Sequence, residues 1–375
     1  MIEVMTNQIA STAPVPQPIR VGALAPLSRP GCLEAGQHLA AGIELAVDEI
    51  NAAGGIGGRP IELLLRDTAG VPERAVDAVR EFAARDAVAI VGEYHSIVAY
   101  AAAGEAVKTR LPFVCSSAVL DAVVDTPTDL VARVAPAQSY CWSVYADYLV
   151  SARYRHVALV IEPNRYWSAG ARLLRTFLPE RGARVTELDY ASLEPASIAD
   201  ALVAAGGVDV LLLLVGYPEP AVSLVKAVRA DPHLAGLRIG DPAGRAESPQ
   251  WWALLGEDGA DVPFLRYLPA RLGPLGTRVA EQVAAQLGEP ASFVAFEGYD
   301  SVQVIAEAMR VGGPDRRRIS EVLTSIKVAG TRGTMSFARG SGADLQWTWP
   351  PVQVASRRDP RRPERISVLF DDGVR

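Results

Sequence analysis

The sequence predicts an α/β protein built from two doubly wound parallel-sheet lobes. Three observations predict this fold: strands and helices alternate along most of the 375 residues, the alternation falls into two similar series, and the strand 208–215 is, apart from Asp209, a run of apolar residues without alternation. A strand of a parallel sheet is covered by helices on both faces, so it needs no polar side. The length agrees, because about 150 residues is a usual domain size.

The first series runs from residue 19 to residue 134. It is predicted to contain strands at 19–25, 61–65, 87–91, 112–115 and 131–134, with helices at 36–53, 72–85 and 97–108. In the first helix, Leu39, Ile43, Val47 and Ile50 recur at helical spacing and predict one buried face. Pro72 suits the first turn of the second helix, where its missing N–H costs nothing.

The second series repeats this pattern from residue 139. It is predicted to contain helices at 139–151, 169–180, 196–205 and 219–229, with strands at 157–161, 184–188, 208–215 and 237–240. Helices at 275–287 and 293–311 follow, and the tail reads as a hairpin with strands at 347–355 and 365–370. Ligand sites of such sheets lie beyond the carboxyl ends of the strands, where the loops converge.

Composition and motifs exclude several classes of function. The net charge is −6 and the basic residues are scattered, which argues against a nucleic-acid surface. No apolar run reaches the roughly 18 residues of a membrane span. The sequence has no phosphate-binding loop and no paired histidines, and the glycine cluster 54–58 follows a helix, the wrong order for a dinucleotide fingerprint. We therefore predict no cofactor and no metal.

The cysteines and the first residues bear on the compartment. Cys32, Cys115 and Cys141 are widely spaced, so neither a disulfide framework nor a zinc site is expected. Residues 1–18, predicted to be a flexible arm, carry no signal-peptide pattern. The sequence as it stands predicts a cytoplasmic protein, and a periplasmic or extracellular one if the chain is processed or trimmed.

Several segments together resemble the type I periplasmic-binding-protein family, in its branched-chain amino acid and amide-binding branch. The resemblance is carried by IRVG at 19–22, GIELAVDEINAAGGIGG at 42–58, IELLLRDTAGVPER at 61–74, AIVG at 89–92, LPFVCSS at 111–117 and FEGYD at 296–300. It implies two lobes that close over a ligand by hinge motion, joined by three crossings near Pro136, Leu268 and Gly342. Lobe one would be 19–136 plus 269–342, and lobe two 137–268 plus 343–375.

The resemblance also implies a ligand site in the cleft between the lobes. The matching positions are Tyr94, Ser96, Ser116, Ser117, Tyr166, Tyr217, Asp241 and Asp261. In relatives, the loop that holds Ser96 donates a hydroxyl and backbone N–H groups to a carboxylate or amide, and a lobe-two acid receives an ammonium, here Asp241 or Asp261. The alternatives are structural: the two serines at 116–117 could cap a turn, the two lobe-two tyrosines could pack on the lobe surface, and Asp241 could shape a turn.

Two residues of the serine loop need a separate interpretation. Glu93 would repel an anionic ligand unless a cation intervened, or it is a solvent-facing rim residue. His95 beside Ser96 suggests nucleophilic catalysis, but adjacent side chains diverge and no third orienting group is evident. A binding-loop serine is the stronger interpretation.

The chain also departs from the family pattern. Val119 stands where amino-acid-binding relatives carry a threonine, and Gly70 and His95 stand where exported relatives carry a cysteine pair. These departures weigh against amino acid specificity and make the cytoplasmic amide sensor of amidase operons a second resemblance.

Three functions follow from the resemblance. The first is a non-enzymatic solute-binding protein that captures a small polar ligand, such as an amino acid or amide, for an ABC importer permease. The alternative is a cytoplasmic ligand sensor that acts on a regulatory protein. The weaker alternative, an enzyme on this scaffold, rests on Glu93, His95 and Ser96 alone.

Overall fold

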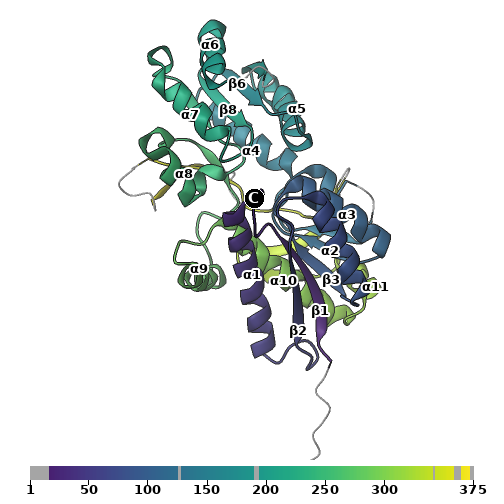
Figure 1. The fold of residues 1–375 in the computed structure, drawn as a ribbon. Helices are drawn as coiled ribbons and strands as arrows, with labels where there is room; N and C mark the ends of the chain where they lie inside the picture. The colour runs from purple at the N-terminus through teal and green to yellow at the C-terminus, as the bar shows by residue number, and fades with distance from the viewer. Residues whose placement is uncertain (1–16, 126–127, 190–193, 341–342, 359–364, 372–375) are drawn as a thin grey trace, which may run out of the picture.

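The chain folds into two lobes (Figure 1), and residues from both lobes line a cavity between them. The computed structural model describes residues 17–125, 128–189, 194–340, 343–358 and 365–371. An eight-stranded sheet forms the first lobe, and a four-stranded sheet with a neighbouring three-stranded sheet forms the second. The predicted α/β class with parallel sheets is confirmed. Most of the predicted arm 1–18 lies outside the described residues.

The sheet of lobe one combines a parallel part with an antiparallel extension. Its strands are β1 (Ile19–Ala25), β2 (Ile61–Asp67), β3 (Ala89–Gly92), β4 (Phe113–Cys115), β5 (Val131–Arg133), β11 (Lys327–Gly330), β12 (Gly333–Gly340) and β13 (Ala343–Trp347). Their order is β11-β12-β13-β5-β4-β3-β1-β2. The first five strands along the chain pair in parallel, whereas β11, β12 and β13 pair antiparallel to one another. None of the strands β11, β12 and β13 was predicted from the sequence, apart from Trp347 at the end of β13.

Helices cover both faces of this sheet. They are α1 (Leu33–Ala52), α2 (Pro72–Ala84), α3 (Ser96–Thr109), α9 (Pro274–Leu287), α10 (Phe293–Gly312) and α11 (Arg316–Val322), with a short 3-10 turn η1 (Asp121–Val123). Alternate residues of β1 serve the two faces: Val21 packs in the cluster that contains α1 and α10, and Leu24 in the one that contains α2 and α3. Gly42 lets α1 approach α10 closely, because a Cβ there would lie 1.9 Å from the Ala295 carbonyl oxygen.

Lobe two repeats the parallel design on a smaller scale. Its elements are α4 (Gln138–Ser151), β6 (His156–Ile161), α5 (Arg165–Glu180), β7 (Arg184–Asp189), α6 (Pro195–Ala205), β8 (Val210–Leu214), α7 (Ala221–Ala230), η3 (Pro232–Leu234), β9 (Arg238–Gly240), η4 (Arg245–Glu247), α8 (Pro249–Leu255) and η5 (Gly256–Gly259). The sheet order is β7-β6-β8-β9, all parallel. Leu211 and Leu212 of β8 face opposite clusters and are both buried, as the unbroken apolar run predicts.

The remaining strands, β10 (Phe264–Arg266), β14 (Gln353–Arg357) and β15 (Ile366–Asp371), form the antiparallel three-stranded sheet. The predicted tail hairpin is present as β14 and β15. Its first strand is shorter than predicted, because Pro350 and Pro351 lack N–H donors and separate β14 from β13.

The boundary predicted near Gly342 needs correction. Gly342 itself lies outside the described residues, but β13 directly after it pairs with β12 and β5. The chain therefore leaves the sheet of lobe one after Trp347, and the segment 348–352 leads into β14 of lobe two. The earlier passages fall between β5 and α4 and between β10 and α9.

A buried ion-pair network holds the start of the first passage against lobe one. Arg332 is fully buried and donates to Asp300 at 3.0 Å, to Glu297 at 3.1 Å and to the Val134 carbonyl at 3.0 Å. Such an ion-pair network is costly to break, because removing one member strands a buried charge. It therefore holds the start of the first passage in place.

Candidate functional site

The cleft between the lobes contains a cavity of about 390 Å³, called the cleft cavity below. Its walls come from segments that follow the carboxyl ends of β1, β2, β3 and β4 in lobe one and of β6, β8 and β9 in lobe two, together with Tyr267 and Phe293. It is lined by Cys32, Gly70, Pro72, Tyr94, His95, Ser96, Ile97, Val98, Ser117, Val119, Asn164, Tyr166, Trp167, Val215, Gly216, Tyr217, Ala243, Arg245, Tyr267 and Phe293. This is where parallel sheets place their ligands.

Aromatic rings make up much of the cavity wall. Tyr166 and Trp167 of lobe two meet edge to face at 4.6 Å between ring centroids, and Tyr267 meets Phe293 in the same way at 4.8 Å. Tyr217 follows β8 on the lobe-two side. Tyrosine and tryptophan rings bury a large apolar area, and their polar groups can orient a ligand through hydrogen bonds. The cavity therefore suits a ligand with an apolar body and few polar groups.

Glu93 lies behind the cavity wall and not on a solvent-facing rim. It is fully buried and accepts hydrogen bonds from the backbone N–H groups of Tyr94 at 2.9 Å and His95 at 2.8 Å, and from the Thr68 hydroxyl at 2.8 Å. Its φ of +67° turns the chain back so that the carboxylate reaches its own loop. Burial raises the pKa of Glu93 to about 7, against the opposing effect of these hydrogen bonds.

His95 is held by the backbone of lobe one. The Cys32 N–H donates to His95 Nε2 at 3.0 Å, so this nitrogen is the acceptor and the ring is neutral with its proton on Nδ1. Burial lowers the pKa of His95 to about 4. His95 Nε2 and the Ser96 hydroxyl bond to other partners and not to each other, so the pair lacks the base–nucleophile geometry of covalent catalysis.

The predicted serines take different places. Ser96 begins α3 and lines the cleft cavity, where its hydroxyl accepts from the Leu120 N–H at 3.3 Å. Ser117 also lines the cavity, and its buried hydroxyl makes no hydrogen bond of normal geometry to a described residue. Ser116 lies outside the cavity, fully buried, and donates to the Glu93 carbonyl at 3.3 Å. Ser116 has the structural role of tying the loop after β4 to the loop after β3.

The three predicted tyrosines all line the cleft cavity. Tyr94 comes from lobe one, and Tyr166 and Tyr217 come from lobe two. Desolvation raises the pKa of each phenol, so all three hydroxyls are neutral donors at physiological pH. The Tyr217 hydroxyl is buried and, like that of Ser117, makes no hydrogen bond of normal geometry to a described residue.

Asp241 acts through Arg245. The fully buried Asp241 lies outside the cavity, and its Oδ1 accepts from Arg245 Nε at 2.9 Å and from Nη2 at 2.6 Å. Arg245 also donates to the carbonyls of Leu213 and Val215, and its guanidinium carbon lies 5.1 Å from the Trp167 ring centroid. The structure thus gives Asp241 the role of holding Arg245, which lines the cleft cavity.

Asp261 lies away from the cleft. Its carboxylate pairs with Arg238 at 3.0 Å and Arg358 at 3.4 Å and accepts from the Ser356 hydroxyl at 3.3 Å. The residue follows η5, beside β14, and does not line the cleft cavity. As a partner for a ligand ammonium, Asp261 is placed wrongly, because a sequence position after a strand does not specify which edge of the lobe its loop occupies.

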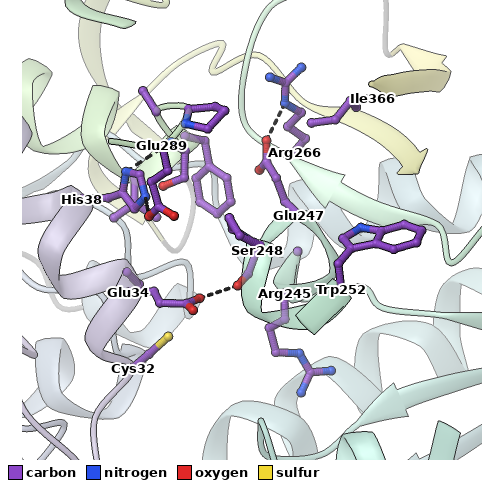
Figure 2. Close-up of a pocket in the computed structure, with 18 of the residues that line it drawn as sticks. Cys32, Glu34, His38, Arg245, Glu247, Ser248, Trp252, Arg266, Glu289 and Ile366 are labelled. Carbon is purple, nitrogen blue, oxygen red and sulfur yellow. Dashed lines mark hydrogen bonds and ion pairs between the residues drawn. The ribbon is translucent and has the colours of Figure 1, made fainter. Parts of the chain in front are cut away.

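A second cavity of about 410 Å³, called the side cavity below, adjoins the first (Figure 2). The two share the wall residues Cys32, Tyr94, Tyr217, Arg245 and Phe293. Across the side cavity, Ser248 of lobe two donates to Glu34 of α1, and His38 Nε2 pairs with Glu289 at 2.9 Å (Figure 2). The Ser248–Glu34 bond joins the two lobes directly.

Sequence reasoning missed several wall residues. Arg245, Trp167, Tyr267, Phe293 and Cys32 line the cleft cavity, although none was predicted there. Trp167 could have been found from its position beside Tyr166. Arg245 offers no local signal, because its role depends on the loop after β9 returning across the ends of β8.

A profile of the periplasmic binding protein family matches residues 18–357. The chain belongs to this family. The Leu/Ile/Val-binding protein homolog 7 of Brucella melitensis is 25% identical over 367 residues, which cover 90% of this chain and 91% of the relative. These matches confirm the predicted resemblance to the branched-chain amino acid branch of type I periplasmic binding proteins.

Solved structures agree with the family fold. The substrate-binding protein LivJ of Streptococcus pneumoniae, in complex with isoleucine, superposes with a TM-score of 0.80 at 20% identity, covering 94% of this chain and 99% of that one. A solute-binding protein of R. palustris, in complex with benzoate, gives 0.77 at 16% identity, covering 94% and 96%.

The family assigns a general function to this periplasmic binding protein. Its relatives are binding proteins and not enzymes, which supports general solute binding by this chain. The prediction of a non-enzymatic protein agrees with these relatives. Over the described residues, no helix is long and apolar enough to cross a membrane, and no cluster of three metal-ligating side chains occurs.

Proposed function

We propose that the protein captures a small polar ligand, such as an amino acid, an amide or a related molecule, in the cleft cavity for an ABC importer. The observation that carries this proposal is the cavity itself: residues from both lobes line one space of about 390 Å³. This volume lies within the roughly 300–1,000 Å³ of small-molecule sites. A ligand that touches both lobes stabilises their closed arrangement, because it binds that arrangement more tightly than the open one.

The names of related proteins support this ligand range. The relative from Brucella melitensis is named for leucine, isoleucine and valine, and a structural neighbour holds isoleucine. Another neighbour holds benzoate. The aromatic and aliphatic wall, with the hydroxyls of Ser96, Ser117 and Tyr217, suits a ligand that combines an apolar body with hydrogen-bonding groups.

A thermal-shift screen with amino acids, amides and aromatic acids tests the proposal. A ligand that binds only the folded state stabilises it by mass action and so raises the melting temperature. At a ligand concentration of one hundred times Kd, the free energy of unfolding rises by about 2.7 kcal/mol. X-ray scattering of the hit should then show a smaller radius of gyration with ligand than without it. A screen without any hit, or a hit that the protein turns over chemically, would contradict solute capture.

The partner and the compartment belong to the same proposal. An importer subunit delivers its ligand to a permease from outside the cytoplasmic membrane, whereas the alternative sensor binds a regulatory protein inside the cell. Cell fractionation of the native protein separates the two: release by osmotic shock supports the importer role. Recovery in the cytoplasm together with a co-purifying regulator would support the sensor.

A further inference from the structure

A buried carboxyl group, that of Glu93, lies directly behind the lobe-one wall of the cleft cavity. The Glu93 carboxyl group accepts hydrogen bonds from the backbone N–H groups of Tyr94 and His95, directly behind the wall residues 94–96. A second carboxylate placed against this loop would lack these two backbone donors, and above the Glu93 pKa of about 7 it would also meet a like charge. Like-charge contact in a dry site is strongly unfavourable. Lobe one therefore disfavours an anionic ligand group.

The lobe-two wall has the opposite character. Among the described residues that line the cleft cavity, Arg245 is the one charged side chain. Asp241 and the carbonyls of Leu213 and Val215 receive four of its N–H groups, which fixes the guanidinium in place. Guanidinium carries five N–H donors, so one on Nη1 remains for a ligand. A rigid, preorganised donor of this kind favours an acceptor, above all a carboxylate.

Aromatic rings from both lobes form much of the wall of the same cavity. Tyr94 and Phe293 from lobe one and Tyr166, Trp167 and Tyr217 from lobe two line the same space. Rings pack best against another planar ring, by offset or edge-to-face contact. The body of the ligand should therefore be planar and apolar.

We propose that Glu93 and Arg245 set the polarity of the cleft, so that it selects an aromatic monocarboxylate whose carboxylate faces lobe two and whose opposite end is uncharged. This inference rests on the proposed function and narrows its ligand class. Glu93 acts as a positioning and specificity residue from behind the wall, and Arg245 contacts the ligand. A dicarboxylate of the same shape is excluded, because its second charge would face the Glu93 loop.

Calorimetry with four small probes, at a pH above the Glu93 pKa of about 7, tests both ends of the cavity. The affinity for benzoate compared with benzamide tests whether the ligand carboxylate binds at Arg245 of lobe two. The affinity for 4-carbamoylbenzoate compared with terephthalate tests whether lobe one rejects a second charged group. The wild-type protein should bind benzoate about tenfold or more tighter than benzamide, because only the carboxylate carries a charge opposite to that of the Arg245 guanidinium. It should bind 4-carbamoylbenzoate at least about tenfold tighter than terephthalate.

Isosteric variants assign each preference to its residue. Glu93→Gln should reduce the discrimination against terephthalate and leave the preference for benzoate over benzamide in place. The double variant Arg245→Gln with Asp241→Asn keeps the buried pair neutral and should abolish the benzoate preference. Glu105→Gln in lobe one removes a single negative charge, and Arg181→Gln with Asp147→Asn in lobe two removes an ion pair. Both controls lie outside the cleft cavity and should change neither preference.

The outcomes separate this inference from the proposed function. Equal affinity for both members of each pair, or unchanged preferences in the two cleft variants, overturns the assigned polarity. If none of the four probes binds while an unrelated solute raises the melting temperature, the aromatic class is wrong and solute capture stands. If no solute of any class binds, the proposed function itself fails.

Discussion

Gln346 Nε2 donates to the carbonyl oxygen of Ala135 at 2.7 Å and so ties the third passage between the lobes to the first. The same amide accepts from Arg133 Nε at 2.7 Å, and Arg133 is fully buried. Two passages that would otherwise bend independently are thereby joined at their lobe-one ends. Hinge motion must then occur beyond this tie, towards lobe two.

Replacing Gln346 by Leu should lower the free energy of unfolding by about 1–3 kcal/mol, because it leaves a buried guanidinium N–H and a carbonyl unpaired. Urea unfolding monitored by tryptophan fluorescence measures this change. Gln37→Leu on the exposed side of α1 is the matched control and should shift stability by about 0.5 kcal/mol or less. Equal effects of the two substitutions would show that the tie contributes nothing.

Ser96→Ala and Tyr166→Ala should each weaken ligand binding by about 1–3 kcal/mol, the cost of an unmade buried hydrogen bond or of a lost aromatic contact. Both side chains line the cleft cavity, one from each lobe. Calorimetry with the ligand identified by the thermal-shift screen measures the loss. Ser325→Ala, on an exposed turn of lobe one, should leave affinity unchanged; unchanged affinity in both cleft variants would remove these residues from the site.

Cys32 should be the thiol that reports on ligand binding. All three cysteines are unpaired, but Cys115 and Cys141 are fully buried whereas Cys32 is partly exposed and lines both cavities. Burial also raises the pKa of Cys32, so its reaction will be slow at neutral pH. Titration with a chromogenic disulfide should modify one thiol in the native protein, more slowly with ligand present. Fast native-state modification of Cys32→Ser would contradict this assignment.

Glu93 should make stability fall as the pH rises. Its folded-state pKa of about 7 lies above its ordinary value of 4.5, so the folded state holds the proton more tightly than the unfolded state. The resulting stabilisation is complete below about pH 4.5 and is lost as the pH rises to 7, with a slope of at most about 1.4 kcal/mol per pH unit.

The variant Glu93→Gln isolates this contribution. It should gain stability relative to the wild type as the pH rises from 5 to 8, in paired denaturant titrations. His95 works in the opposite direction between pH 6.5 and 4, because its folded pKa is lowered to about 4, so the comparison with the variant matters more than the wild-type curve. A constant difference between the two proteins across this pH range would disprove the prediction.

Gly42→Ala should destabilise the protein by about 1–3 kcal/mol, as overpacking does. A Cβ at this position would meet the Ala295 carbonyl oxygen at 1.9 Å and would force α1 away from α10. Gly104→Ala in α3 is the matched control, because a Cβ there meets nothing within 4 Å. It should stabilise the protein by about 0.5–1 kcal/mol, since alanine is the better helix former. Thermal unfolding of both variants should thus give shifts of opposite sign.

Local patterns in the sequence determined the parallel core and the loops that carry half of the cleft. The apolar run at β8, the helical spacing of Leu39 and Ile43 in α1, and the loop after β3 were all predictable, because burial and turn chemistry act over a few neighbouring residues. The resemblance to the family pointed to Tyr94, Ser96 and Tyr166, and these residues share one cavity because strand ends gather at one edge of a sheet.

Tertiary structure alone decided the charges of the cleft. Whether Glu93 faces solvent, ligand or its own backbone depends on a left-handed φ and on Thr68, which lies 25 residues earlier. Asp241 and Asp261 look alike in sequence, yet one holds Arg245 beside the cavity and the other pairs with Arg238 away from it. Electrostatic roles depend on distances between residues remote in the chain, and those distances exist only after the lobes have packed.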